Sequence, residues 1–243
     1  MVSHFAKNRD FIIVRELQKQ ILGAYQNDFS KHVSKQLLPK LIMVWESIPA
    51  QLAKENKKFR YGDLKAGGRA KEFEDAIMWL KNSGLIHTIH RLNKPDLPIK
   101  SYIEYNAFKM FMLDVGLLSA MSGLDARTLL EGNKIFTEFK GSLAEQFALQ
   151  ELNALSNMEI AYWAADMGAI AEIDFVIQYR DLVVPLEIKS STNIKSKSLQ
   201  VYISKFSPAI ALRGSLADYK VTDNLHDLPL FMIMTIPNLL DAL

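Results

Sequence analysis

The chain has 243 residues, of which 49% are hydrophobic, and its formal net charge is +2. A chain of this length can bury a sizeable core, and a typical domain length of about 150 residues allows one large domain or two small ones. Without cysteine there is no disulfide framework or thiolate metal site, and the five histidines lack zinc-type spacing. No apolar run approaches the roughly 18 residues of a membrane span, and the first ten residues are too polar for a signal peptide. We therefore expect a cytoplasmic protein that does not engage membranes.

The charge is unevenly distributed along the chain. Residues 1–130 carry 20 Lys and Arg against 13 Asp and Glu, whereas residues 131–243 carry 9 against 14, which gives +7 followed by −5. This asymmetry fits a basic arm beside an acidic, metal-attracting site. It fits two ordinary domains that dock through opposite charge nearly as well.

The beginning of the chain predicts a helix. Residues 11–26 place Ile13, Leu17 and Ile21 at four-residue steps, which is the spacing of an amphipathic helix with one apolar stripe. Such a stripe needs a partner surface. We therefore predict that residues 1–34 form an N-terminal docking helix.

Residues 35–124 have the pattern of a winged helix-turn-helix domain. The expected elements are a helix from Pro39, a helix over 70–83 capped by Gly84, strands over 85–91 and 99–105, and a closing helix over 108–118. With a short helix between the first two, this order of helices followed by a two-stranded ribbon is typical of a winged helix.

A basic segment lies inside this predicted domain. Residues 51–71 hold seven basic residues against two acidic ones. The candidate nucleic-acid-binding residues are Lys57, Lys58, Arg60, Lys65 and Arg69. Lysine and arginine on a winged helix bind the phosphate backbone through counterion release. The next helix opens with Glu72, Glu74 and Asp75, which repel phosphate, so we do not expect it to read bases, and protein docking is an alternative role for the segment.

Residues 125–243 predict an α/β sandwich. The expected elements are a helix over 141–155, strands over 159–164, 172–179 and 182–189, a helix over 197–206 and a strand over 209–213. Residues 228–236 are apolar enough for either a buried strand or a helix. A tight turn at residues 180–181 joins the second and third strands into a hairpin.

Three charged residues in this hairpin are the candidate site. Side chains alternate along a strand, so Glu187 and Lys189 point to the same face, and the hairpin brings Asp174 beside them. Charges inside apolar strands are costly unless they are paired or bind a metal. Two carboxylates match the oxygen ligands that Mg²⁺ takes from proteins, and Glu145 on the preceding helix is a further candidate ligand. A structural ion pair at the end of the sheet is the alternative reading.

At these residues the sequence resembles a known superfamily. Asp174, the thirteen-residue step to Glu187 and the triplet ending at Lys189 are similar to the D…ExK signature of PD-(D/E)XK nuclease-like proteins, with Glu145 at the position of a helix-borne acid. About the whole chain resembles the C-terminal region, a domain of unknown function, that follows the ATPase module in bacterial and archaeal AAA-type ATPases. The matching stretches are residues 14–32, 56–69, 107–118 and 141–145, and residues 162–163 leading to 172–176.

The resemblance implies a winged helix followed by a restriction-endonuclease-like fold, with an ATPase in the same chain or acting as a separate protein. No G-x-x-x-x-G-K-[ST] motif occurs here, so we do not expect this chain by itself to bind or hydrolyse ATP.

The expected function is a DNA-acting module with a Mg²⁺- or Mn²⁺-dependent site for phosphodiester hydrolysis. Asp174 and Glu187 would be metal ligands, Glu145 would assist, and Lys189 would orient the attacking water. The alternative is a non-catalytic module that binds DNA or protein and regulates the ATPase, in which the same acids are vestigial.

Overall fold

The computed structural model describes residues 1–124, 137–165, 171–192 and 195–243. The chain divides into two units: unit 1 comprises Met1–Thr88 and Lys109–Phe139, and unit 2 comprises Ile89–Phe108 and Lys140–Leu243. The division falls within two strands that are shared by both units. The predicted division at residues 34 and 124 stays a prediction.

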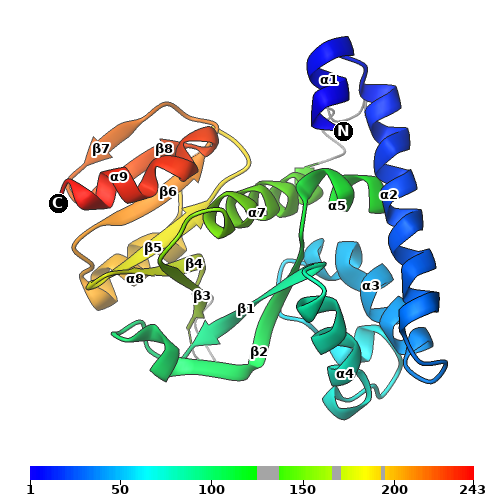
Figure 1. The fold of residues 1–243 in the computed structure, drawn as a ribbon. Coiled ribbons are helices and arrows are strands. Elements are labelled where there is room, and N and C mark those ends of the chain that lie inside the picture. Colours follow the sequence, from blue (N-terminus) through cyan, green and yellow to red (C-terminus); the bar gives the residue numbers. More distant parts are fainter. Residues whose placement is uncertain (125–136, 166–170, 193–194) are drawn as a thin grey trace. The chain divides into compact units, whose positions relative to one another are not determined.

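Helices dominate unit 1 (Figure 1). Its elements are α1 (Val2–Asn8), α2 (Phe11–His32), α3 (Leu38–Leu52), the 3-10 helix η1 (Tyr61–Asp63), α4 (Ala70–Asn82) and α5 (Val115–Met121). The carboxylate of Asp10 accepts hydrogen bonds from the backbone N–H groups of Ile12 and Ile13, which fixes the start of α2. Gly84 follows α4 at φ 69°, the left-handed geometry that favours glycine after a helix.

The core of unit 1 is built on aromatic edge-to-face contacts. The ring of Phe29 on α2 lies 5.6 Å from the ring of Trp45 on α3 and 5.5 Å from that of Trp79 on α4. The Arg15 guanidinium donates to Ser119 Oγ at 2.9 Å, which ties α2 to α5. The helix predicted over residues 11–26 is therefore confirmed within α2, whereas α1 is a separate short helix before it. Phe11, Ile12 and Ile13 at the start of α2 are exposed.

Two predicted elements differ from the structure. Residues 99–102, expected to begin a strand, form the 3-10 helix η2 (Ile99–Tyr102), and the strand itself begins at Ile103. Residues expected to form a helix over 108–118 lie mostly in strand β2 (Ile103–Met112), and the helix α5 begins only at Val115, where Asp114 caps it by accepting from Leu117 N–H at 2.8 Å. All of residues 107–112 are buried, so this part of the strand has no solvent-exposed face. Without alternation a short apolar run reads equally well as a helix, and only its place in the sheet decides.

Unit 2 is built around a mixed sheet. Its strands are β1 (Ile86–Leu92), β2, β3 (Met158–Ala164), β4 (Glu172–Tyr179), β5 (Leu182–Ile188), β6 (Ala211–Ser215), β7 (Lys220–Thr222) and β8 (Leu225–Pro229), in the spatial order β2-β1-β3-β4-β5-β6-β8-β7. The β3, β4 and β5 strands form an antiparallel meander. Strand β6 pairs parallel to both β5 and β8. The structure is thus a mixed α/β fold.

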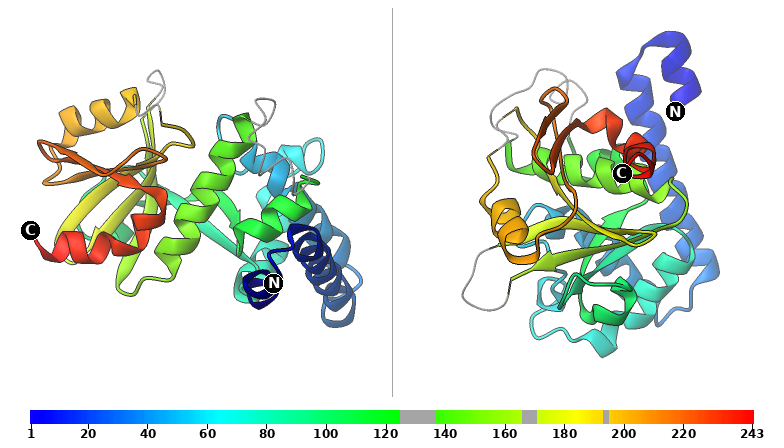
Figure 2. Two further views of the ribbon diagram at one scale, coloured as in Figure 1. Left: turned by 90° about the horizontal axis from the view of Figure 1, so that it is seen from above. Right: turned by 90° about the vertical axis from the view of Figure 1, so that its left-hand side faces the viewer.

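Helices cover both faces of this sheet (Figure 2). They are α7 (Thr137–Asn153), α8 (Lys197–Phe206), the 3-10 helices η2 (Ile99–Tyr102) and η4 (Leu230–Thr235), and α9 (Ile236–Asp241). Residues 228–236, which the sequence left open, comprise the end of β8, all of η4 and the first residue of α9. Among the described residues, no helix is long and apolar enough to cross a membrane.

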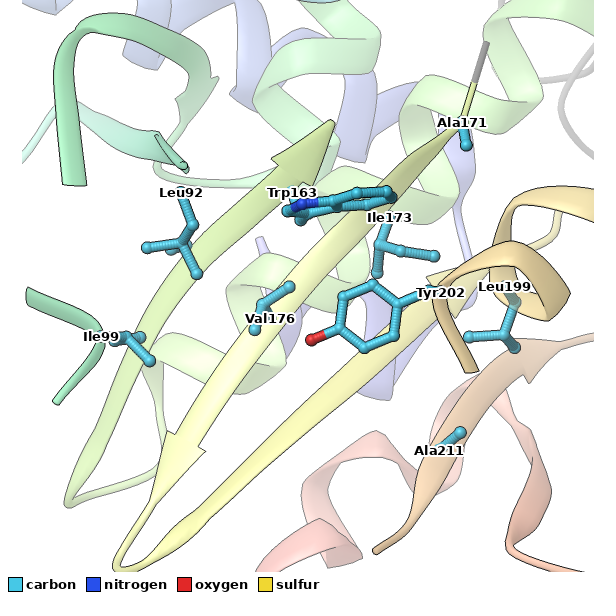
Figure 3. Close-up of a cluster of buried hydrophobic side chains, with 10 residues drawn as sticks. Leu92, Ile99, Trp163, Ala171, Ile173, Val176, Leu199, Tyr202 and Ala211 are labelled. Atoms are coloured by element: carbon cyan, nitrogen blue, oxygen red, sulfur yellow. The ribbon is translucent and has the colours of Figure 1, made fainter. Parts of the chain in front are cut away.

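The core beneath α8 is aromatic (Figure 3). The ring of Trp163 on β3 lies 5.4 Å from that of Tyr202 and 5.3 Å from that of Phe206, both on α8. Ile173, Val176 and smaller side chains complete this buried cluster. It anchors α8 to the meander, and the N-terminus of α8 is thereby held at the end of β5.

Candidate functional site

The β4–β5 hairpin brings Asp174 to Glu187 as predicted. The antiparallel register ends with Phe175 opposite Leu186, and one step further along Asp174 meets Glu187. The Asp174 Oδ2 atom accepts a hydrogen bond of 2.9 Å from the backbone N–H of Ile188. Where the backbone pairing of β4 and β5 stops, the Asp174 carboxylate therefore replaces a backbone carbonyl as the hydrogen-bond acceptor.

A register shift in β4 accompanies this arrangement. Ala161 pairs with Val176, but Trp163 pairs with Ile173, so Tyr162 on β3 faces one residue too many on β4. Such bulges bend a strand and redirect a side chain. The extra residue falls at Asp174 and Phe175, so the bulge lies at the candidate site.

Glu187 is the most deeply buried acid of the hairpin, with 5% of its surface exposed. Its Oε1 atom accepts from Lys189 Nζ at 2.6 Å and from Ser196 Oγ at 3.1 Å, whereas Oε2 has no hydrogen-bond partner within the described residues. Burial first, and the nearby charge of Asp174 second, raise the pKa of Glu187 to about 7. The site therefore favours an added positive charge or a proton.

Lys189 is half-buried beside these acids. Burial by itself lowers the pKa of its ammonium group, but the charges of Glu187, Asp174 and Glu145 and the hydrogen bond to Glu187 outweigh it, so the net shift of the pKa is upward. Lys189 therefore stays protonated. The charge of Glu145, a buried acid on α7, is the smallest of these contributions to the upward shift of the pKa of Lys189.

Ser196 connects the site to α8. Its hydroxyl accepts from Leu199 N–H at 3.2 Å, which caps the helix, and donates its own proton to Glu187 Oε1. Ser196 is not among the site residues predicted from the sequence. A serine directly before an expected helix is a recognisable capping pattern, but its contact with the glutamate is visible only in three dimensions.

The chemistry of the donors fits a hard divalent cation. Two carboxylates lie side by side, and one buried oxygen of Glu187 has no donor within the described residues. Mg²⁺ commonly takes only one or two carboxylates from a protein and keeps several waters. The residues described contain no cluster of three or more His, Cys, Asp and Glu side chains that would hold an ion. Metal ligation by Asp174, Glu187 and Glu145 stays a prediction.

The second charged pair on this sheet was missed. Arg213 Nε on β6 donates to Asp227 Oδ1 on β8 at 2.6 Å, and both side chains are nearly buried. Their Cα register continues that of the site, because Glu187 pairs with Arg213 and Arg213 pairs with Asp227. The sequence signal for this pair is a charged residue within a short apolar run.

The candidate nucleic-acid residues lie in unit 1 on the connection between α3 and α4. Lys58, Arg60, Lys65 and Arg69 are exposed, and Lys57 is half-buried. The buried amide of Gln51 fixes Arg60 by accepting from its N–H at 3.1 Å and donating to its carbonyl at 3.0 Å. Lys58 forms a β-bridge with Lys109. The segment is thus held by its backbone while most of its cationic side chains face solvent.

Acidic neighbours take up part of this positive charge. Lys65 Nζ lies 3.7 Å from Glu72 at the start of α4, and Lys54 forms an ion pair of 2.5 Å with Asp63. Both pairs are at least partly exposed. They are therefore weak, and they leave a net positive surface around Lys58, Arg60 and Arg69.

Two family models match separate parts of the chain. The structure is a mixed α/β fold with helices in its N-terminal part and buried charged residues in its C-terminal sheet. A family model for a domain of unknown function, DUF8612, matches residues 1–128, more than half of the chain, and the chain belongs to this family. A second model, the domain of unknown function DUF4143, matches residues 140–237. That domain is known from proteins associated with AAA-type ATPases.

The family matches confirm part of the predicted resemblance, namely that the chain consists of domains of unknown function. They show neither a link to an ATPase nor a nuclease-like fold. Neither a curated protein nor a solved structure gave a match.

Proposed function

We propose that this chain is a DNA-acting module that hydrolyses phosphodiesters with Mg²⁺ or Mn²⁺ through Asp174, Glu187 and Lys189. One observation carries the proposal: the buried carboxylate of Glu187 lies beside that of Asp174, one of its oxygens lacks a donor within the described residues, and its pKa is raised to about 7. Burying a carboxylate costs free energy, and leaving one of its oxygens without a donor costs more. We therefore infer that the core retains this group for a function.

The proposed chemistry assigns one task to each residue. A divalent cation held by Asp174 and Glu187, with Glu145 assisting, would lower the pKa of water to give a nucleophile near neutral pH and would neutralise phosphate charge. Ser196 and the backbone N–H of Ile188 hold the two carboxylates in place. The Lys189 ammonium group, a donor with three protons, orients the water and stabilises negative charge on the phosphoryl oxygens.

The proposed fold assignment is finer than the comparisons reach. In unit 2 the order of α7, the β3–β5 meander, α8 and the parallel strand β6 supports a restriction-endonuclease-like α/β sandwich. The order of α3, η1 and α4, followed by β1 and β2, with Lys58 as a one-residue strand, supports a winged helix. Both orders support the assignment, and an experimental structure with bound metal would test it.

DNA is the proposed partner, bound with little sequence preference. Exposed cations around Arg60 attract phosphate without reading bases, and the acids at the start of α4 disfavour insertion of that helix into a groove. An ATPase, in the same polypeptide or as a separate protein, is the proposed second partner, because DUF4143 is known from proteins associated with such enzymes. These partners are in keeping with a cytoplasmic protein.

Metal binding is the direct test of the site. Calorimetry with Mg²⁺ and Mn²⁺ should detect binding to the native chain, and Asp174→Asn should abolish it. Asparagine retains an oxygen that can accept from Ile188 N–H, so the hairpin should stay folded while the charge is lost. Asp181→Asn in the exposed turn at the other end of the hairpin is the matched control and should bind as the native chain does. A native chain that binds neither ion contradicts the proposal.

Hydrolysis requires a separate measurement. Nicking of supercoiled plasmid in the presence of Mn²⁺ should be lost in Glu187→Gln and in Lys189→Met, with thermal unfolding used to show that each variant is folded. Nicking that survives in both variants comes from a contaminating enzyme and removes the assignment of these residues.

A second function is favoured by the ion pair itself. Lys189 Nζ lies 2.6 Å from Glu187 Oε1, so part of the acidic charge is already neutralised within the chain. The same fold would then be a non-catalytic module that binds DNA or protein and regulates an ATPase. This function predicts no metal binding, and it predicts that Glu187→Gln with Lys189→Met leaves partner binding unchanged.

A further inference from the structure

A row of charged residues crosses three adjacent strands of unit 2. Glu187 on β5, Arg213 on β6 and Asp227 on β8 are successive Cα register partners. Partners on neighbouring strands project to the same face of a sheet, and the strands lie about 4.8 Å apart. Arg213 therefore stands directly beside the residue at the centre of the candidate site, although the proposed hydrolysis gives it no role.

The Arg213–Asp227 pair makes contact at one point only. Nε donates to Asp227 Oδ1 at 2.6 Å, while 11% of the arginine side chain and 3% of the aspartate side chain are exposed. A guanidinium group has five N–H donors, and the four on its terminal nitrogens make no hydrogen bond within the described residues. The acid thus fixes the stem of the group and leaves its forked end available.

This geometry differs from that of a pair that serves stability. The desolvation cost of a buried ion pair is offset best by two parallel hydrogen bonds. Such bonds would use the forked end of the guanidinium. Here that end makes no hydrogen bond within the described residues, and Arg213 is the register partner of Glu187. A planar fork held in one orientation is suited to two oxygens of a phosphate.

Charge balance points in the same direction. Asp174 and Glu187 repel a phosphodiester, and the ammonium group of Lys189 is already engaged with Glu187. The next cation along the sheet is Arg213, which can offset this repulsion at the point where the substrate backbone must approach.

We propose that Arg213 binds the two non-bridging oxygens of a phosphate group of the nucleic-acid backbone beside Glu187, and that Asp227 is a positioning residue that holds the guanidinium for this contact. The identity of the ligand rests on the proposed function. The contact itself does not require hydrolysis, so the two can be tested separately.

The test uses the full chain and a fluorescently labelled DNA duplex without divalent cations, with affinity measured over a series of salt concentrations. Arg213→Lys retains the positive charge and the partner for Asp227 but loses the fork. We expect affinity to fall about tenfold, since a bidentate charge-assisted contact is lost, while the salt dependence stays nearly the same because the charge is kept. The melting temperature should not change.

The matched control is Arg180→Lys. Arg180 also pairs with an aspartate, its terminal nitrogen lying 3.0 Å from Asp241 Oδ1, but it is exposed and lies in the turn at the far end of the β4–β5 hairpin. DNA affinity should be unaffected by this change. An Arg213→Lys variant that binds as tightly as the native chain overturns the inference.

Asp227→Asn tests the positioning role by the sign of its effect. Removal of a carboxylate near a phosphate site should tighten DNA binding if the acid only repels the ligand. If the acid holds Arg213 in place, its loss should weaken binding instead, and we expect weaker binding. Tighter binding overturns the role of Asp227.

Cleavage assays separate this inference from the proposed hydrolysis. If the native chain does not nick plasmid with Mg²⁺ or Mn²⁺ but Arg213→Lys still weakens duplex binding, hydrolysis fails and the phosphate contact stands. If nicking occurs and Arg213→Lys changes neither duplex affinity nor KM, hydrolysis stands and the contact fails.

Discussion

The two units of this chain use charge in opposite ways. In unit 1 the cations around Arg60 are exposed, while the backbone beneath them is fixed by Gln51 and by the bridge to Lys109. In unit 2 the charges of Glu187, Arg213 and Asp227 lie in the sheet, each nearly removed from solvent. Exposed charges act through their sum and tolerate replacement, whereas a buried charge depends on its particular partner.

The two units can therefore contribute to function in different ways. A surface of solvated cations attracts a polyanion over a distance and is weakened by salt. A buried group of acids and bases holds a few atoms in fixed positions and is screened little. Substitutions in the two units should therefore differ in which property they change, stability or association, and in how strongly salt modifies the result.

The largest effect is expected for Asp227→Ala. This change leaves the guanidinium of Arg213 in a nearly buried position without its partner, and we expect a loss of about 3–5 kcal/mol in the free energy of unfolding. Urea denaturation followed by circular dichroism measures it. A double variant with Arg213→Met should lose much less than the single one, because no unpaired charge remains. Equal losses in the two variants would show that the pair does not act through its charge.

The pH dependence of stability should report Glu187. Its pKa rises from 4.5 to about 7 on folding, so the folded state holds this proton more tightly than the unfolded state. The contribution to stability is complete below about pH 4.5 and is lost as the pH rises through 7, a decline on the order of 1–3 kcal/mol in metal-free protein. Denaturation of the native chain and of Glu187→Gln at pH 5 and pH 8 measures this decline, which the variant should not show. A native chain that gains stability toward pH 8 relative to the variant contradicts the direction.

Replacement of a glycine by alanine should have opposite effects on stability in the two units. A Cβ atom at Gly214 on β6 would lie 2.9 Å from Ile188 Cδ1, so Gly214→Ala should destabilise by about 1–3 kcal/mol. At Gly23, within α2, the same atom would meet nothing within 4 Å, and Gly23→Ala should stabilise by about 0.5–1 kcal/mol through helix propensity. Thermal unfolding compares both variants with the native chain. Destabilisation by Gly23→Ala would indicate that this face of α2 is more crowded than described.

The smallest effect on stability belongs to the exposed cations. Lys57→Glu with Arg60→Glu should change the free energy of unfolding by no more than about 0.5 kcal/mol. The same change should weaken DNA binding and flatten its salt dependence. Lys19→Glu with Lys31→Glu on the exposed side of α2 reverses the same amount of charge elsewhere in unit 1 and is the control. An unchanged salt slope would assign the segment around Arg60 to protein recognition.

Much of the secondary structure followed from local patterns. The helices α2, α4 and α8 have apolar residues at helical spacing and clear ends, and β4 and β5 have β-branched residues joined by a two-residue turn. The part of β2 beyond residue 105 was predicted as a helix because residues 107–112 are all buried and show no alternation between a buried and an exposed face. The strands β7 and β8 are short and were not anticipated, since pairing with β6 and with each other defines them.

Only those residues of the candidate site that lie close together in the sequence were predicted. Asp174, Glu187 and Lys189 fall on one hairpin, so strand alternation and a short turn were enough to bring them together. Ser196, Arg213 and Asp227 reach the same face through a helix cap and two parallel strands, and their contacts depend on crossovers that local patterns do not specify.

The sequence by itself determined the composition of the site and the hairpin that carries it, because alternation along strands is a property of neighbouring residues. The tertiary structure decided that Glu187 is buried, that its second oxygen lacks a donor within the described residues, and that Arg213 stands beside it with its forked end available. Burial and register arise from packing between segments far apart in the chain. They set the pKa values and the open hydrogen-bond donors on which the chemistry depends.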